Sequence, residues 1–192
     1  MDNPFVPTLL VAKALEAVGT AYCIGGSLAS GIYGLGRATM DADLVAPLQE
    51  GQIDSLLKIL GQDFYADADM IREAIRLRRS FNVIHLPTMF KVDVFIPGSS
   101  PHALEQIKRR RLETLDPLTG ESAYFAAPED IILAKLNWYI KSGHSERQWQ
   151  DILGIIKTQG LRLDLAYLKH WAETLGLRDE LRRALAEGEL PD

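Results

Sequence analysis

Three aspartates stand at positions where their side chains could share one metal ion. Asp41 and Asp43 lie two residues apart in segment 39–45, and Asp93 lies in segment 91–95; both segments have the composition of strands. Residues two apart on a strand point to the same face of a sheet, and neighbouring strands lie about 4.8 Å apart. We therefore expect Asp41, Asp43 and Asp93 to form an acidic triangle when the two segments are neighbours.

Such a triangle favours a divalent cation. Three carboxylates brought together repel one another unless a cation neutralises them. Mg²⁺ is the natural candidate, with Mn²⁺ as a substitute, because it binds hard oxygen ligands and keeps water and substrate phosphate as its remaining partners. Taken alone, an Asp-x-Asp pair is more often a solvent-exposed face. Here Ala42 and Leu44 alternate with Asp41 and Asp43, which indicates one buried and one acidic face.

A glycine turn precedes the acids. Segment 21–24 is predicted to be a short buried strand that ends at Gly25-Gly26, and Ser27 is expected to cap a helix over 28–33. Backbone amides at a helix N-terminus, without nearby Cβ atoms, are suited to an anion such as phosphate. The alternative is a tight corner with no ligand. The chain lacks the glycine signatures of P-loop and dinucleotide-binding proteins.

The positioning elements divide the chain at Ala127. Before it, the patterns predict an α/β half, residues 1–127; after it, every apolar stripe has helical spacing, over residues 128–192. Pro128 is expected in the first turn of a helix, Ser145 and Gln148 in a capping box, and Asp164 just before a third helix. The remaining predicted elements are helices over 4–18, 53–60, 69–79 and 101–111, strands over 41–46, 81–86 and 90–96, the last two as a hairpin, and extended pieces around Leu115 and Tyr124.

Composition limits the class of protein. The 192 residues are 47% hydrophobic with a formal net charge of −5, which is ordinary for a globular protein and does not favour polyanions. Cys23 is the only cysteine, so an internal disulfide and a cysteine-based zinc cluster are excluded. The N-terminus lacks the features of a signal peptide and no apolar run reaches membrane-spanning length. We expect a cytoplasmic protein that does not enter a membrane.

The motifs together resemble the nucleotidyltransferase superfamily that includes DNA polymerase beta. Its signature is Gly-Gly/Ser, a spacer, an acid-x-acid pair and a third acid on a later strand, matched here by Gly26-Ser27, a spacer over 28–40, Asp41-x-Asp43 and Asp93. The strings 37–43 and 128–135, with Asp151-Ile152, resemble bacterial AbiEii-type and related stand-alone nucleotidyltransferases. The resemblance covers residues 22–153. It implies an α/β (α+β) fold with a mixed sheet flanked by helices and a C-terminal helical bundle.

The resemblance also implies roles for individual residues. Asp41, Asp43 and Asp93 would be catalytic and would hold two Mg²⁺ ions, with Asp93 helping to activate the acceptor hydroxyl. The residues implied in binding the NTP are Gly25, Gly26, Ser27, Arg37, Thr39, Lys135 and Asp151. Read from the sequence alone, Lys135 could equally be a surface lysine, and Asp151 could pair with Arg147 one turn earlier.

The function expected from these residues is transfer of a nucleoside monophosphate from an NTP to a hydroxyl group, with release of pyrophosphate. The acceptor could be tRNA or another RNA, a protein or a small molecule. One alternative is a toxin-antitoxin or regulatory module that keeps the fold, binds nucleotide and pairs with a cognate toxin or antitoxin, without catalysis. Another is a magnesium-dependent phosphohydrolase.

Overall fold

The computed structural model describes residues 5–116 and 118–190, and the chain forms two compact units. Unit 1 comprises Met1–Gly25 and Ala38–Phe125; unit 2 comprises Gly26–Arg37 and Ala126–Asp192. The segment that contains the predicted anion-binding helix thus groups with the C-terminal helices. The contiguous boundary near residue 127 stays a prediction from the sequence.

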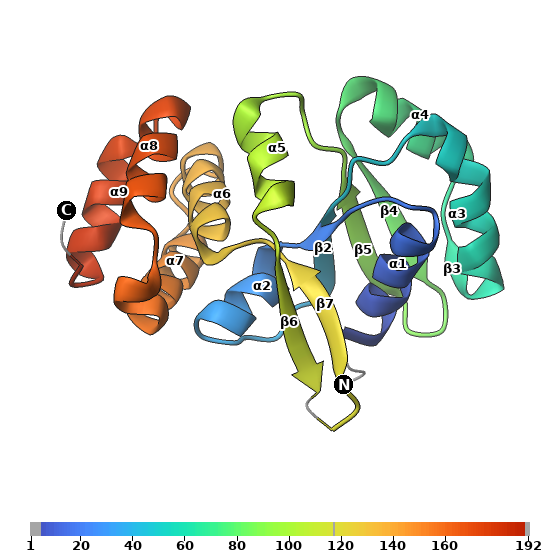
Figure 1. The fold of residues 1–192 in the computed structure, drawn as a ribbon, viewed down its shortest axis with the longest axis horizontal. Helices are drawn as coiled ribbons and strands as arrows, with labels where there is room; N and C mark the ends of the chain where they lie inside the picture. The colour runs from blue at the N-terminus through green and yellow to red at the C-terminus, as the bar shows by residue number, and fades with distance from the viewer. Residues whose placement is uncertain (1–4, 117, 191–192) are drawn as a thin grey trace. The chain divides into compact units, whose positions relative to one another are not determined.

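Unit 1 is built on a mixed sheet (Figure 1). The described residues give seven strands in the order β3-β4-β5-β2-β1-β7-β6. The pairs β1–β7 and β2–β5 are parallel, and the other neighbouring pairs are antiparallel. The strands are β1 (Cys23–Ile24), β2 (Asp41–Val45), β3 (Phe64–Tyr65), β4 (Ser80–His85), β5 (Phe90–Phe95), β6 (Arg111–Asp116) and β7 (Glu121–Phe125).

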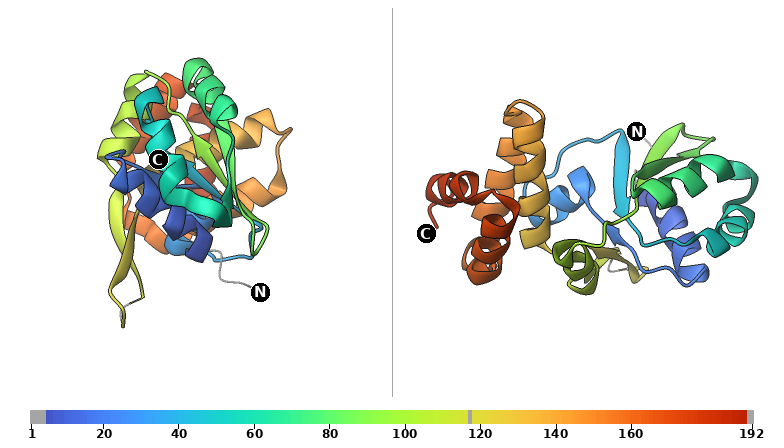
Figure 2. Two further views of the ribbon diagram at one scale, coloured as in Figure 1. Left: turned by 90° about the vertical axis from the view of Figure 1, so that its right-hand side faces the viewer. Right: turned by 90° about the horizontal axis from the view of Figure 1, so that it is seen from above.

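Helices cover one face of the β4–β5 part of this sheet. Helix α3 packs against α1 and α4, while α1 contacts β5 and α4 contacts β4 (Figures 1 and 2). Side chains that are at most 2% exposed alternate with accessible ones along β2, β4 and β5. This alternation fixes which face of each strand is buried. The helical elements of unit 1 are α1 (Phe5–Ala17), α3 (Ile53–Leu60), α4 (Ala68–Leu77), α5 (Pro101–Lys108) and the 3₁₀ turns Glu50–Gln52 and Gly61–Asp63.

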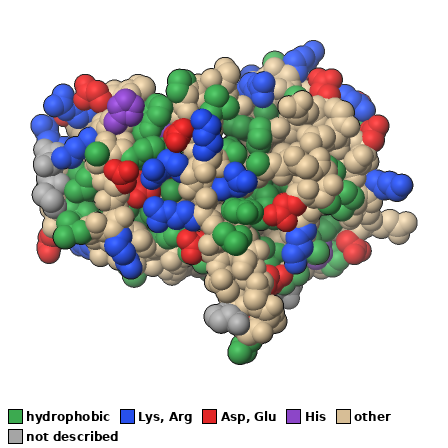
Figure 3. Space-filling model, viewed as in Figure 1, with side chains coloured by type: hydrophobic (Ala, Val, Ile, Leu, Met, Phe, Trp, Pro, Cys, Tyr) green, Lys and Arg blue, Asp and Glu red, His purple; other side chains and the backbone are tan. Residues whose placement is uncertain are grey.

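Unit 2 is helical. Its helices are α2 (Gly26–Tyr33), α6 (Pro128–Lys141), α7 (Glu146–Gln159), α8 (Leu165–Leu175) and α9 (Arg178–Glu187), with a 3₁₀ turn at Gly160–Arg162. Helices α6 and α7 form an antiparallel pair that packs on α2, and α8 and α9 pack on them (Figure 1). Acidic and basic side chains are intermixed over the surface around α8 and α9 (Figure 3).

The ends of the helices in unit 2 agree in part with the residues predicted at those positions. As expected, Pro128 is in the first turn of α6 and Asp164 directly precedes α8. The Asp164 carboxylate also caps α8, since it accepts from the Tyr167 amide, 2.9 Å away. The capping box is wrong: Ser145 precedes α7, but its side chain makes no capping hydrogen bond. Gln148 accepts instead from Lys135, so a longer-range contact displaced the local one. Helix α2 begins at Gly26, so Ser27 lies in its first turn rather than capping it.

The fold class predicted from the sequence is confirmed, since a mixed sheet flanked by helices is followed by a helical region. Across the described part of the chain, every helix is too short or too polar to span a lipid bilayer.

Close backbone packing at Gly34 gives a first test of unit 2. A Cβ atom at Gly34 would lie 2.8 Å from the Ile155 nitrogen and 2.9 Å from the Gly154 carbonyl carbon, both in the backbone of α7. We expect Gly34→Ala to lower the free energy of unfolding by about 1–3 kcal/mol, because backbone cannot move aside as a side chain can. Urea denaturation measures this change.

Gly51→Ala is the matched control. A Cβ at Gly51 would have no heavy atom within 4 Å, so its effect should stay within about 0.5 kcal/mol. Equal unfolding midpoints for the two variants would show that α7 does not pack on Gly34 this closely.

Candidate active site: an acidic sheet face and a buried ion cluster

The three predicted aspartates lie on one face of two neighbouring strands in unit 1. Strands β2 and β5 run parallel, with Asp43 directly opposite Asp93 and Asp41 directly opposite Lys91. On the other face, Ala42, Leu44, Val92 and Val94 are at most 1% exposed. Burial of these four side chains fixes the register, and the register brings Asp43 and Asp93 together.

Lys91 occupies the acidic face with the aspartates. Its Nζ donates to Asp93 Oδ2 at 2.7 Å, with the Lys91 side chain 41% exposed and that of Asp93 15% exposed. The hydrogen bond to Asp93 raises the pKa of Lys91; partial burial opposes this, and the charges of Asp93, Asp41 and Asp43 add to it. Lys91 was not among the residues predicted from the sequence, although its position two residues before Asp93 places it on the same face.

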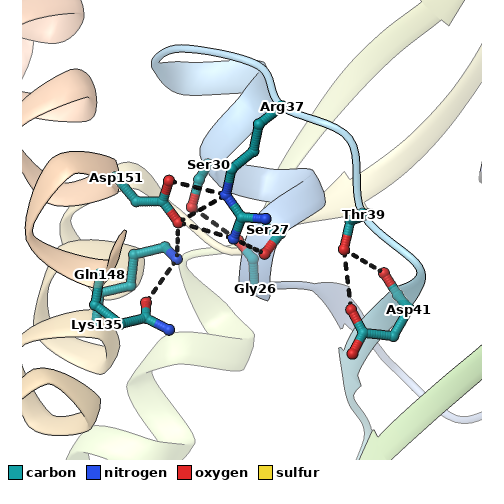
Figure 4. A network of polar contacts seen from close by, with 9 residues as sticks. All are labelled: Gly26, Ser27, Ser30, Arg37, Thr39, Asp41, Lys135, Gln148 and Asp151. Atoms are coloured by element: carbon teal, nitrogen blue, oxygen red, sulfur yellow. Dashed lines mark hydrogen bonds and ion pairs between the residues drawn. The ribbon is translucent and has the colours of Figure 1, made fainter. Parts of the chain in front are cut away.

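Thr39 holds the Asp41 carboxylate. The Thr39 hydroxyl lies 2.9 Å from Asp41 Oδ1 and 3.1 Å from the Asp41 carbonyl oxygen (Figure 4). Thr39 was predicted to contact nucleotide. In the structure it orients an acid two residues away, which is a local contact typical of a threonine before a strand.

The glycine turn differs at its two glycines. The Gly25 amide donates to the Asp43 carbonyl oxygen, 2.8 Å away, so it joins the end of β1 to β2. Gly26 has φ +56°, a left-handed conformation that favours glycine. It begins α2, and its carbonyl oxygen accepts from the Ser30 hydroxyl at 2.8 Å. Gly25 therefore has a structural role, while Gly26 lets the chain enter the helix.

A second cluster lies within unit 2 around Asp151 (Figure 4). The Arg37 guanidinium donates from Nε to Oδ1 and from Nη2 to Oδ2, both at 3.1 Å, and from Nη2 to the Ser27 hydroxyl. Lys135 Nζ donates to Asp151 Oδ2 at 2.7 Å and to Gln148 Oε1 at 3.0 Å. Gln148 and Asp151 are three residues apart on α7, so they share the helix face that meets Lys135.

The cluster is largely removed from solvent. The Lys135 and Asp151 side chains are each 6% exposed, and Arg37 is 25% exposed. Burial alone would raise the pKa of Asp151, but the hydrogen bonds and charges of Arg37 and Lys135 outweigh it and lower the pKa. Lys135 is thus not a surface lysine, and Asp151 pairs with Arg37 and Lys135 rather than with Arg147.

The side chains of the acidic face are of the chemical type that binds magnesium. Asp41, Asp43 and Asp93 offer hard carboxylate oxygens on one face, the ligand type that Mg²⁺ prefers. Within the described ranges, no three side chains of His, Cys, Asp or Glu are close enough together to hold a metal ion in the positions they occupy. In this arrangement the ammonium group of Lys91 lies 2.7 Å from Asp93 Oδ2.

Comparison with known proteins defines the class of fold. No family model matches the sequence, and no curated protein matches it. Two solved structures share its architecture over nearly the whole chain, at sequence identities that report on the fold alone. The chain has a nucleotidyltransferase-like α/β fold.

The first of these structures is the solution structure of the antibiotic-resistance factor ANT(2'')-Ia. Its TM-score is 0.57 at 15% identity, covering 98% of this chain and 97% of that chain. The second is the crystal structure of an antigenic nucleotidyltransferase-like protein from Paracoccidioides brasiliensis. Its TM-score is 0.52 at 18% identity, covering 94% and 91% of the two chains. The finer likeness to AbiEii-type proteins stays a prediction.

The buried cluster predicts a large effect of Asp151→Asn at neutral pH. Removing one partner of a buried ion pair typically costs about 3–5 kcal/mol, because the remaining charge stays buried without compensation. We expect the free energy of unfolding to fall by roughly 3 kcal/mol, measured by urea denaturation. Asp179→Asn is the control, since its carboxylate is 81% exposed and pairs with Arg182 at the surface.

The same variant gives a pH signature. A carboxyl group whose pKa is lowered in the folded state contributes stability above its unfolded pKa, near 4, and loses it as pH falls through the folded pKa. The stability difference between wild type and Asp151→Asn should therefore be constant above about pH 5 and shrink below pH 4. A difference that does not depend on pH would contradict the ion pairs.

Proposed function

We propose that this protein is a magnesium-dependent nucleotidyltransferase that moves a nucleoside monophosphate from an NTP to a hydroxyl acceptor. The observation that carries the proposal is the register of β2 and β5, which sets Asp43 opposite Asp93 with Asp41 on the same face. The nucleotidyltransferase-like fold supports it. RNA, including tRNA, a protein or a small molecule could supply the hydroxyl.

The proposed transfer is a displacement reaction at the α-phosphorus of the NTP. The acceptor oxygen forms a bond to the α-phosphorus of the NTP. The bond between that phosphorus and the oxygen bridging the α- and β-phosphates breaks, and pyrophosphate leaves with the electron pair. The proton of the acceptor hydroxyl goes to a base. We assign this role to the Asp93 carboxylate, because a positioned carboxylate can act as a general base once Lys91 no longer occupies it.

The metal would be held by the carboxylates of Asp41, Asp43 and Asp93, and the resemblance implies two Mg²⁺ ions, for which Mn²⁺ could substitute. When bound, divalent cations stabilise negative charge on the phosphate oxygens. The residues of the chain itself orient these ligands: Thr39 fixes Asp41 by a hydrogen bond, and the β2–β5 ladder fixes Asp43 against Asp93.

Nucleotide binding is proposed for residues of unit 2. Arg37 and Lys135 are cationic, and Ser27 lies in the first turn of α2, where backbone amides favour anions. Within this proposal Asp151 holds the two cations in place, and Gly26 permits the start of the helix. The structural contacts of Gly25 and Thr39 give these two residues supporting roles.

The alternative is a toxin-antitoxin or regulatory module that binds nucleotide without turning it over. The ion pair between Lys91 and Asp93 is the observation that favours it, because an ammonium group on Asp93 weakens that carboxylate as a base and as a metal ligand. Such a module would co-purify with a stoichiometric partner and show no transfer.

Transfer is tested by incubating the protein with Mg²⁺, each α-³²P-labelled NTP and cell extract. We expect wild type to label an acceptor and Asp43→Asn to lower the labelling rate at least about 100-fold, because loss of a metal-binding carboxylate removes transition-state charge stabilisation. Release of labelled nucleotide without any acceptor would instead identify a phosphohydrolase.

The control for charge is Asp54→Asn, whose carboxylate is 92% exposed on α3 of the same unit. It should label as wild type does. If wild type labels no more than Asp43→Asn with all four NTPs, the proposed transfer is wrong.

The contact between Thr39 and Asp41 gives a second test in the same assay. Thr39→Val keeps the shape of the side chain but removes the hydroxyl, and we expect the labelling rate to fall about 10–100-fold, as for loss of a group that orients a metal ligand. Thr39→Ser restores the donor and should recover most of the rate. Equal rates for the valine and serine variants would show that the hydroxyl does not position Asp41.

A further inference from the structure

Lys91 is a cation built into the acidic face. It comes from β5 and lies opposite Asp41 on β2 and opposite Ile84 on β4. Its ammonium group contacts Asp93 at 2.7 Å. The acids on this face therefore have a positive charge beside them without any metal.

A divalent ion bound to Asp93 would compete with this ammonium group. Mg²⁺ binds carboxylate oxygens at about 2.0–2.1 Å. Lys91 is hydrogen-bonded to Asp93 Oδ2, so an ion on this carboxylate would lie within a few Å of the ammonium. Two cations at that separation repel each other even in a largely aqueous environment. Either the ammonium moves or the ion binds weakly.

The side chain of Lys91 is able to move. It is 41% exposed, whereas Asp93 is 15% exposed, and its flexible four-carbon stem can extend into solvent. Asp93 lies within β5, and the parallel pairing of β5 with β2 holds its backbone in place. When the two charges separate, the lysine is therefore the partner that leaves.

We propose that Lys91 is the resident counter-ion of the acidic face, which a divalent cation must displace from Asp93, so that Lys91 sets the divalent-ion affinity of the site. This inference rests on the metal site in the proposed function. Displacement separates the ammonium group from Asp93 when the metal arrives, so metal binding is coupled to the breaking of the Lys91–Asp93 ion pair. Lys91 acts through Asp93 and is thus a positioning residue.

The test is Mn²⁺ binding without nucleotide or acceptor, measured by the electron paramagnetic resonance signal of free Mn²⁺. Lys91→Met removes the charge and keeps an unbranched apolar stem. We expect it to bind Mn²⁺ roughly tenfold more tightly than wild type, the order for removing one positive charge a few Å from a divalent ion. Lys91→Arg keeps the charge and should bind as weakly as wild type.

Lys13→Met is the matched control. Lys13 is a lysine of unit 1 that is 60% exposed and makes a 3.0 Å ion pair with Glu121, so its loss changes the net charge and removes a salt bridge in the same way. Its Mn²⁺ affinity should equal that of wild type. Asp43→Asn should lose the binding. A second readout is the rise in unfolding midpoint on adding Mn²⁺, which should be larger for Lys91→Met than for wild type.

The outcomes separate this inference from the proposed function. If Lys91→Met binds Mn²⁺ no more tightly than wild type, or only as Lys13→Met does, Lys91 does not compete with the metal and the inference is overturned, while nucleotidyl transfer is untouched. Tighter binding by Lys91→Met with no labelling of any acceptor supports the counter-ion role and counts against transfer. Absence of Mn²⁺ binding in wild type and in every variant also overturns this inference, and nucleotidyl transfer is then decided by the labelling assay, in which NTP is present.

Discussion

Burial of the apolar side chains on one face of β2 and β5 is the constraint on which the acidic face of unit 1 depends. Burial of Ala42, Leu44, Val92 and Val94 on the opposite face forces Asp41, Asp43 and Asp93 to the accessible side, whatever the cost of bringing like charges together. Lys91 offsets part of that cost, since it makes an ion pair with Asp93 and its pKa is raised by the surrounding acids. The hydrophobic pattern thus determines which face carries the charged side chains, and Lys91 supplies a positive charge on that face.

Unit 2 presents the opposite case, in which an acid, Asp151 on α7, is buried. Asp151 is removed from water, and an isolated carboxylate there would be neutral rather than charged. Arg37 and Lys135 keep it ionised by donating hydrogen bonds to both of its oxygens, and Ser27 receives a further bond from Arg37. Three segments far apart in the sequence, near residues 27–37, 135 and 148–151, are joined by this cluster. The arrangement makes α2 and the loop after it part of the helical unit, which agrees with the close approach of Gly34 to α7.

Elements with strong periodic patterns could be predicted from the sequence, and those without such patterns were missed. The strands that carry the acids, the hairpin of β4 and β5, and the helices α1, α3, α6, α7 and α8 follow from alternation and from turn residues. Strand β3 has two residues and leaves no pattern. Helix α9 lies in the region 128–192 that was predicted to be helical, but its bounds were not predicted, because charged residues surround Leu181, Ala184 and Leu185. The capping box at Ser145 failed for a different reason: Gln148 has a partner on another helix, which no local motif can indicate.

The sequence by itself determined the types and spacing of the acids, the strand periods that place Asp41 with Asp43, and the class of fold, a mixed sheet followed by helices. These features depend on neighbours within a few residues, where backbone geometry is regular. Only the tertiary structure decided that Asp93 faces Asp43 rather than Asp41, that Lys91 occupies Asp93, and that Asp151 pairs with Arg37 and Lys135. Strand register and helix packing are set by burial of the whole apolar surface, and that sum cannot be read from any one segment.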